Sequence, residues 1–187
     1  MITLTAVLLA GGESRRMGRD KATIELDGQP LWKRQLEILR LLRPERMFVS
    51  ARRTPAWLPE DVDLLLDDPP SRGPLSGLTN ALAAMRTTHL LALAIDMPFI
   101  RSETLRNLWS FAQTGRGVVP VIGVRVEPLA AIYPAEAAAE FSEALAGADF
   151  SLHRVIRKLA ADKKVKLCAV RVEDQHLYRS VNEPGDL

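Results

Sequence analysis

Short apolar runs alternate along the chain with longer segments whose apolar residues recur at helical spacing. A continuous apolar run is typical of a strand buried on both faces, whereas spacing of three and four residues is typical of an amphipathic helix. The apolar runs predict strands at residues 5–10, 46–51, 62–66, 90–95, 118–121, 128–133 and 165–172. The helical spacing predicts helices at residues 31–42, 75–85, 102–111, 135–146 and 151–161. Residues 22–26, followed by Asp27-Gly28, predict a short extended segment and a turn.

This alternation predicts an α/β fold with three layers, α/β/α, around a Rossmann-like, mostly parallel sheet. Strands without polar interruptions need cover on both faces, and the helices between them supply parallel crossovers. No linker rich in glycine, serine or proline divides the chain, so we expect residues 1–187 to form a single domain. Ligands of such sheets bind outside the carboxyl ends of the strands. Residues that directly follow a predicted strand, such as Gly11 and Asp96, are therefore the first candidates for function.

The composition excludes several classes of protein. Of the 187 residues, 47% are hydrophobic and 26% are charged, which is an ordinary globular mixture rather than a disordered one. The 25 basic and 23 acidic residues leave a net charge of only +2, so we expect no binding of nucleic acid through bulk charge. Cys168 is the only cysteine, which excludes a disulfide framework and favours a reducing cytoplasm. No apolar stretch reaches the length of a membrane helix, and we expect no membrane association.

A glycine-rich, basic loop follows the first predicted strand. That strand's apolar run has no basic flank and ends in Gly-Gly, so we interpret it as a buried strand rather than a signal peptide. The loop contains three glycines and four cations, namely Gly11, Gly12, Arg15, Arg16, Gly18, Arg19 and Lys21. Its spacing matches neither the Walker A loop nor the dinucleotide fingerprint. Composition alone is equally consistent with a solvated basic loop, but the position after a buried strand favours triphosphate binding.

The same loop resembles the signature of a known family. Leu9-Ala10-Gly11-Gly12-x-Ser14-x-Arg16-Met17-Gly18-x-Asp20-Lys21 is similar to the signature loop of nucleotidyltransferases of the molybdenum cofactor guanylyltransferase type. Its Gly-Gly pair resembles the guanylyl-transferring branch, since the cytidylyltransferases usually carry Ala-Gly there. Four further segments resemble the family in order along the chain: Gly73-Pro74-Leu75-Ser76-Gly77-Leu78, Asp96-Met97-Pro98-Phe99, Glu127-Pro128-Leu129 and Asn182-Glu183-Pro184-Gly185-Asp186-Leu187. The resemblance spans nearly the whole chain and implies a fold of the nucleotide-diphospho-sugar transferase type.

The resemblance implies an enzyme that transfers GMP from GTP to the terminal phosphate of molybdopterin and releases pyrophosphate. The acceptor phosphate is itself the nucleophile, so positioning and charge stabilisation would supply most of the catalysis. The implied catalytic residues are Arg16, Lys21 and Asp96. Arg16 suits the leaving β- and γ-phosphates because its planar fork binds two oxygens, and Lys21 suits the α-phosphate as a point charge.

Mg²⁺ is the cofactor that the resemblance implies, with Asp96 as its ligand. A hard cation of this kind takes oxygen ligands, and only one or two of them from the protein. Asp96 is a poor candidate for a helix cap, because Ser102 is better placed to cap the next predicted helix. Asn182 is the implied second ligand for metal or pyrophosphate, and an ordinary terminal turn residue is the equal alternative.

The family's nucleotide site corresponds to residues spread over the first half of the chain. The implied nucleotide-binding residues are Leu9, Ala10, Gly11, Gly12, Ser14, Arg16, Gly18, Lys21, Asp67, Gly73, Pro74, Leu75 and Asp96. Asp67 or Asp68 takes the place of the family's nucleoside-binding acid. The spacing to Gly73 favours Asp67, and a turn carboxylate is the alternative for either.

The resemblance divides the domain into two functional parts. Residues 1–100 would bind nucleotide and metal, and residues 101–187 would form the acceptor side. The chain departs from the family's pattern at Ser180 and at residues 125–127, which leaves the acceptor-binding residues open. Arg154 is a contact to the acceptor phosphate or a solvent-facing helix residue, and the second interpretation is favoured.

Two other functions remain alternatives. One is nucleotidyl transfer to or from other substrates, by a molybdopterin cytidylyltransferase or a sugar-phosphate nucleotidyltransferase. The other is a catalytically silent GTP-binding regulatory protein, against which the intact Arg16, Lys21 and Asp96 argue. The substrates implied for a guanylyltransferase are GTP and molybdopterin. Because molybdopterin is sensitive to oxygen, transient contact with molybdopterin-insertion proteins and apo-molybdoenzymes is expected as well.

Overall fold

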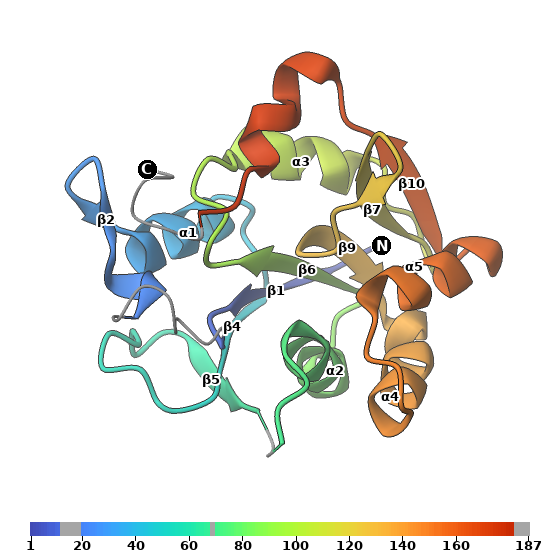
Figure 1. Cartoon of the computed structure of the whole chain (residues 1–187), viewed down its shortest axis with the longest axis horizontal. Coiled ribbons are helices and arrows are strands. Elements are labelled where there is room, and N and C mark those ends of the chain that lie inside the picture. Colours follow the sequence, from blue (N-terminus) through green and yellow to red (C-terminus); the bar gives the residue numbers. More distant parts are fainter. Residues whose placement is uncertain (12–19, 68–69, 182–187) are drawn as a thin grey trace.

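The computed structural model describes residues 1–11, 20–67 and 70–181, and a single sheet forms its middle layer. The strands of this sheet are β1 (Leu4–Leu9), β4 (Arg46–Ala51), β5 (Asp63–Leu66), β6 (His89–Ala94), β7 (Gly117–Ile122), β8 (Arg125–Val126), β9 (Ala130–Pro134) and β10 (Val165–Ala169). Their order is β10-β7-β9-β6-β1-β4-β5, with β8 paired to β7 (Figure 1). A separate hairpin of β2 (Glu25–Leu26) and β3 (Gln29–Pro30) leads into the first helix.

β1 runs through the middle of the sheet and is buried along its whole length. It pairs in parallel with β4 on one side and with β6 on the other. The β4–β5 and β7–β10 pairs are also parallel, which confirms the expected mostly parallel sheet. β9 is antiparallel to both β6 and β7. The sequence pattern predicted β9 as a strand but carried no signal for its direction.

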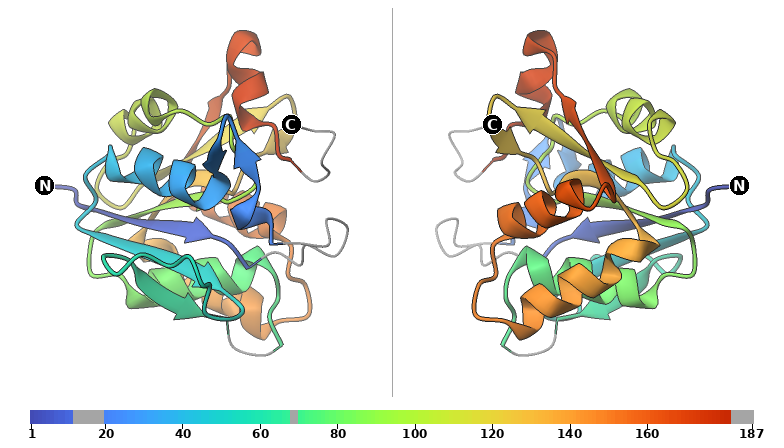
Figure 2. Two further views of the ribbon diagram at one scale, coloured as in Figure 1. Left: turned by 90° about the vertical axis from the view of Figure 1, so that its left-hand side faces the viewer. Right: turned by 90° about the vertical axis from the view of Figure 1, so that its right-hand side faces the viewer.

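Helices cover both faces of the sheet, as the views from two sides show (Figure 2). They are α1 (Leu31–Arg40), α2 (Pro74–Ala84), α3 (Ser102–Ser110), α4 (Ala138–Ala146) and α5 (Leu152–Ala161). α1 and α3 supply apolar side chains to the core on one face, and α2, α4 and α5 supply those on the other. The expected three layers are therefore confirmed. No helix in the described ranges combines the length and the apolar character needed to cross a bilayer.

The structure corrects several predicted boundaries. The last predicted strand, residues 165–172, ends at Ala169, and a 3₁₀ segment, η3 (Val172–Tyr178), follows it. Two more 3₁₀ segments, η1 (Lys21–Thr23) and η2 (Ala135–Ala137), precede β2 and α4. Ser102 is not the helix cap but the first residue of α3, and the cap position belongs to Arg101.

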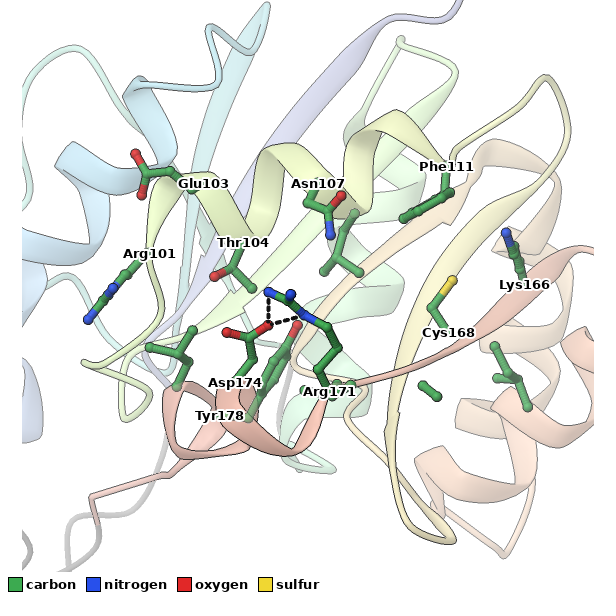
Figure 3. A pocket seen from close by; sticks show the side chains of 15 residues that line it. Arg101, Glu103, Thr104, Asn107, Phe111, Lys166, Cys168, Arg171, Asp174 and Tyr178 are labelled. Atoms are coloured by element: carbon green, nitrogen blue, oxygen red, sulfur yellow. Dashed lines mark hydrogen bonds and ion pairs between the residues drawn. The ribbon is translucent and has the colours of Figure 1, made fainter.

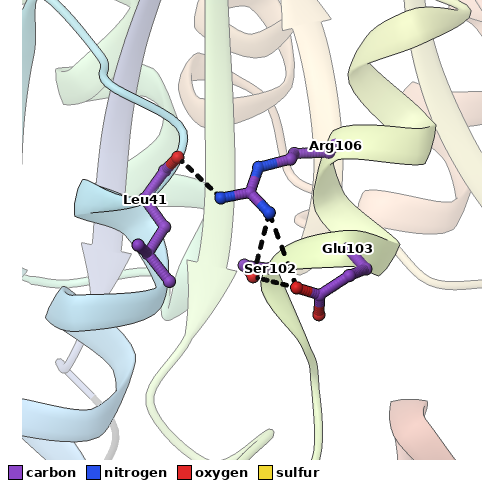
Figure 4. A network of polar contacts seen from close by, with 4 residues as sticks. All are labelled: Leu41, Ser102, Glu103 and Arg106. Atoms are coloured by element: carbon purple, nitrogen blue, oxygen red, sulfur yellow. Dashed lines mark hydrogen bonds and ion pairs between the residues drawn. The ribbon is translucent and has the colours of Figure 1, made fainter.

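The hydroxyl of Ser102 does not cap the backbone of α3 but binds a neighbouring side chain. It donates to the carboxylate of Glu103 at 2.9 Å. Arg106 joins the same group and also donates to the carbonyl of Leu41 at the end of α1, at 3.1 Å (Figure 4). Exposed ion pairs of this kind contribute little to stability. The attachment of α1 and α3 to the sheet therefore rests mainly on buried apolar side chains such as Leu36.

His89 is a fully buried polar side chain at the start of β6. Its Nε2 lies 3.0 Å from the carbonyl oxygen of Gln113 and 3.3 Å from that of Arg116. Because carbonyl oxygens only accept, Nε2 carries a proton, and Nδ1 lies 2.9 Å from the hydroxyl oxygen of Thr88. Burial lowers the pKa of His89, and the two carbonyls offset this effect only in part.

We expect the protein to become less stable as the pH is lowered, because of His89. A histidine whose folded pKa lies below the unfolded value contributes stability above about pH 6.5, and this stability is lost as the pH falls through the folded pKa. Denaturant unfolding between pH 8 and pH 5 measures the loss. His89→Gln removes the titrating ring, so its stability should depend less on pH than that of the wild type. His176→Gln, on the exposed surface of η3, is the control and should keep the wild-type slope.

Candidate functional site

The carboxyl ends of β1, β4 and β6 are bound to one another by backbone hydrogen bonds. The N–H of Ala10 donates to the carbonyl of Ser50 at 2.8 Å, and the N–H of Ile95 donates to that of Leu9 at 3.1 Å. A cavity of about 260 Å³ opens at this edge. Its lining residues are Leu9, Gly11, Lys21, Ser50, Arg52, Asp67, Gly73, Pro74, Ala94, Ile95, Asp96 and Leu129. The location matches the expectation that ligands bind beyond the strand ends.

A lysine and an aspartate face each other across this cavity. The Nζ of Lys21 lies 3.6 Å from Oδ2 of Asp96, and the two side chains are only 16% and 26% exposed. Lys21 also donates to the carbonyl of Val181 at 3.2 Å, and the N–H of Val181 donates to the carbonyl of Asp96 at 2.7 Å. The backbone of Val181 therefore binds both residues.

Burial and charge act in opposite directions on Asp96. Burial raises the pKa of this carboxyl group, and the neighbouring Lys21 ammonium lowers it. A carboxylate held in such a place needs positive charge beside it. Lys21 supplies that charge here, and a divalent cation would supply more.

Asp67, at the end of β5, is the second acid of the cavity and is only 8% exposed. Its carboxylate accepts from the hydroxyl of Ser50 at 3.1 Å and from that of Ser71 at 2.8 Å. Its backbone N–H donates to the carbonyl of Ala51 at 3.0 Å. The two hydroxyl donors fix the orientation of this acid, and a carboxylate has acceptor capacity beyond two hydrogen bonds, so N–H groups of a ligand can also bind it.

The start of α2 forms the wall next to Asp67. Gly73 has a φ of +65°, a conformation that favours glycine, and Pro74 begins the helix at a position where a missing N–H costs nothing. The hydroxyl of Ser71 also accepts from the N–H of Gly73, at 3.3 Å. Ser71 therefore binds both Asp67 and the residue before α2.

The donor set fits Mg²⁺. No cluster of three or more metal-ligating side chains occurs within the described ranges, so no site made of protein groups alone is found there. Mg²⁺ does not require such a cage, because it is usually bound by one or two carboxylates together with water and substrate phosphates. Asp96 is one such carboxylate, partly exposed at the cavity.

Most of the predicted site residues that the structure describes gather at the cavity. They are Leu9, Gly11, Lys21, Asp67, Gly73, Pro74 and Asp96. Two others do not line it: Ala10 follows β1 and binds Ser50 through its backbone, and Leu75, in the first turn of α2, is fully buried in the core. Five more predicted residues lie outside the described ranges: Gly12, Ser14, Arg16, Gly18 and Asn182. The alternative acid, Asp68, also lies outside them.

Sequence reasoning missed five residues of the lining: Ser50, Arg52, Ala94, Ile95 and Leu129. Ser50 and Arg52 stand at and just after the end of β4, so the rule applied to Gly11 and Asp96 could have found them. Leu129 precedes β9, whose antiparallel direction brings its first residues to the same edge. It also lies beyond residue 100, so the cavity is not confined to the part of the chain expected to bind nucleotide.

Arg154 forms an ion pair with Asp149 at 3.1 Å, and its side chain is 77% exposed. This geometry supports the favoured interpretation as a solvent-facing residue.

A larger cavity, of about 990 Å³, runs between α3, β10 and η3 (Figure 3). Figure 3 shows Arg171 and Asp174 paired at its edge, and their closest distance is 2.7 Å. No residue predicted for nucleotide or metal binding lines this cavity. The smaller cavity is therefore the candidate site.

The sequence is similar to a known family over most of its length. Residues 6–165 match the family described as the MobA-like NTP transferase domain. A protein of Opitutus terrae named probable molybdenum cofactor guanylyltransferase is 34% identical over 186 residues, which covers 98% of this chain and 92% of that protein. The molybdenum cofactor guanylyltransferase of Pseudomonas fluorescens is 34% identical over 163 residues, which covers 83% of this chain and 80% of that protein.

Solved structures share the fold. Molybdopterin-guanine dinucleotide biosynthesis protein A from Archaeoglobus fulgidus matches with a TM-score of 0.75 and 21% identity, over 97% of this chain and 94% of that one. The 2-C-methyl-D-erythritol 4-phosphate cytidylyltransferase of Thermus thermophilus matches with a TM-score of 0.68 and 14% identity, over 96% and 93%. These likenesses confirm the expected nucleotidyltransferase type of fold.

We expect Gly77→Ala to destabilise the protein at the side of the cavity where Asp67 lies. A Cβ at this position of α2 would collide with Oγ of Ser50 and lie 2.9 Å from Cδ2 of Leu9. The displaced hydroxyl would lose its bond to Asp67, and overpacking of this kind costs about 1–3 kcal/mol. Denaturant unfolding measures the loss.

A double variant tests the cause. Adding Ser50→Ala to Gly77→Ala removes the hydroxyl that the new Cβ would meet. The double variant should therefore lose less unfolding free energy than the sum of the losses in the two single variants. Gly147→Ala, where a Cβ meets only ordinary contacts, should stay near the wild-type stability. Additive losses would show that Ser50 is not the obstacle.

Proposed function

The chain belongs to the family of MobA-like NTP transferases, and on that premise we propose that it is a molybdenum cofactor guanylyltransferase. The reaction transfers GMP from GTP to the terminal phosphate of molybdopterin and releases pyrophosphate. The relatives that share about a third of its residues over most of its length support this assignment.

One geometric observation carries the proposal. Lys21 and Asp96 come from separate parts of the chain and meet 3.6 Å apart at a cavity beyond the strand ends. A cation and a carboxylate at that place suit a nucleoside triphosphate, whose α-phosphate needs positive charge and whose metal ion needs an oxygen ligand. No separate protein nucleophile is required.

The chemistry follows from the charges involved. An oxygen of the acceptor phosphate attacks the α-phosphorus of GTP, a new P–O bond forms, and the bond to the β-phosphate oxygen breaks. Lys21 stabilises the negative charge that develops on the α-phosphate oxygens. Asp96 would hold Mg²⁺, and bound Mg²⁺ would neutralise charge on the triphosphate and the leaving pyrophosphate. Arg16 and Asn182 keep the roles expected from the sequence, at the leaving phosphates and as a second ligand.

Asp67 is proposed to receive the nucleoside. Its carboxylate is held by two serine hydroxyls and lies in the same cavity as Lys21. Guanine presents N–H groups that can donate hydrogen bonds to a fixed carboxylate, whereas a phosphate fits better beside Asp96, where the Lys21 ammonium offsets the repulsion between anions. The two acids therefore divide the cavity into a nucleoside end at Asp67 and a phosphate end at Asp96.

The remaining assignments follow from the substrates. GTP and molybdopterin are the proposed substrates, and Mg²⁺ is the proposed cofactor. Transient contact with molybdopterin-insertion proteins and apo-molybdoenzymes would protect an oxygen-sensitive product during transfer. The cytoplasm, where GTP is available and cysteine stays reduced, is the proposed location.

Calorimetric titration with GTP, CTP, ATP and dTTP, each with Mg²⁺, tests the proposal. We expect selective binding of GTP. Lys21→Ala should weaken GTP binding and lower turnover with molybdopterin by about 100- to 1000-fold, because it removes a charge aimed at the transition state. Asp96→Ala should abolish turnover, and chelation of Mg²⁺ should do so reversibly. Lys166→Ala, at the other cavity, is the control and should leave both measurements unchanged.

Different outcomes would identify the alternatives. Preference for CTP or dTTP would keep the reaction type and replace the substrate. Binding of GTP without turnover when molybdopterin is supplied would favour a silent regulatory protein. Turnover that persists in Asp96→Ala would contradict the metal assignment.

A further inference from the structure

α1 carries a buried amide on the apolar side that it packs against the sheet. Gln35 is fully buried, and its neighbours on this face of the helix are core residues such as Leu36 and Leu39. An apolar side chain would complete the core without the cost of removing an amide from water. The amide therefore calls for an explanation in terms of what it binds.

Gln35 binds the turn that carries Asp96. Its Nε2 donates to the carbonyl of Met97 at 2.7 Å and lies 3.5 Å from the carbonyl of Ala94. These two carbonyls flank Asp96 in the chain, one at the end of β6 and one directly after the acid. Since both groups only accept hydrogen bonds, the nitrogen of the amide must face them.

The amide oxygen of Gln35 has no comparable interaction in the part of the chain that the structure describes. Oε1 of Gln35 is buried and has no hydrogen-bond partner within the described ranges. A buried acceptor without a partner is unfavourable, and an apolar residue of similar shape would avoid that cost. The benefit of Gln35 must then come from the turn.

The same turn is anchored at two further points. Nε of Arg34, also on α1, donates to the carbonyl of Pro98 at 3.0 Å. The N–H of Val181 donates to the carbonyl of Asp96 itself at 2.7 Å. The backbone around Asp96 is thus fixed on both sides, while its carboxylate points toward Lys21 in the cavity.

We propose that Gln35 is a positioning residue for nucleotidyl transfer, which holds the Asp96 carboxylate in place for the metal ion. The inference rests on the proposed function and extends it to a residue that touches neither nucleotide nor metal. Partners that orient a metal ligand typically account for about 10- to 100-fold in metal affinity or activity.

Gln35→Met tests this role, because methionine has a similar length and donates no hydrogen bond. We expect the Mg²⁺ concentration for half-maximal turnover to rise by about 10-fold or more. Calorimetry provides a readout that is independent of turnover. GTP affinity measured with Mg²⁺ should fall by a similar factor, whereas GTP affinity measured in excess chelator should change little. Hydrogen exchange at the backbone amides of Asp96 and Met97 should become faster.

Two control variants on α1 separate positioning from loss of stability. Leu39→Ala removes a fully buried side chain of the same helix and should lower the unfolding free energy by about 2–5 kcal/mol, without changing the Mg²⁺ dependence of the folded enzyme. Lys33→Met changes an exposed neighbour and should change neither. If Gln35→Met does not fold, Arg34→Met is the substitute, since it removes the bond to Pro98 from the helix surface and should shift the Mg²⁺ dependence in the same direction.

The outcomes distinguish this inference from the function on which it rests. A wild-type protein that binds no GTP overturns both. The inference alone is overturned if the wild-type protein binds GTP but Gln35→Met and Arg34→Met show the same Mg²⁺ dependence as Leu39→Ala.

Discussion

Strands buried on both faces impose the constraint from which the rest of the structure follows. Every residue of β1 and β6 is buried, and a charged side chain there would lose its hydration without gaining a partner. Along β1 and β6, functional polar groups are therefore found beyond the strand ends rather than within the strands. Gly11, Arg52, Asp67 and Asp96 follow four neighbouring strands, and parallel pairing brings all four to one cavity.

The same constraint explains what the sequence could predict. Asp96 was identifiable because it interrupts an apolar run, and the strand and helix positions were identifiable because their hydrophobic periods differ. Leu129 was not, because its place depends on the direction of β9, and short apolar strands look alike in either direction. Ser102 was misassigned because the preference for serine as a cap takes no account of a competing carboxylate one residue away. Gln35 stands within a helical pattern, and only the packing of α1 against the Asp96 turn reveals its contacts.

Two acids in one cavity illustrate how their surroundings give the same chemical group different properties. Asp67 accepts hydrogen bonds from two side-chain hydroxyl groups, which fix its orientation. Asp96 is faced by an ammonium group and anchored through its backbone, so its charge is balanced and its position depends on the turn. The sequence contains the two acids, but the contrast between them arises only from the groups that the fold places around each one.

The bond between Lys21 and the carbonyl of Val181 joins residues 160 positions apart. Contacts between such distant residues require the largest loops to close, and the entropy lost in closing them makes such contacts slow to form. During synthesis on a ribosome, β1, β4 and β6 can already be paired while Val181 is still absent. The contacts of Val181 with Lys21 and Asp96 are then still missing, so these two residues would reach their final arrangement only after Val181 has been made.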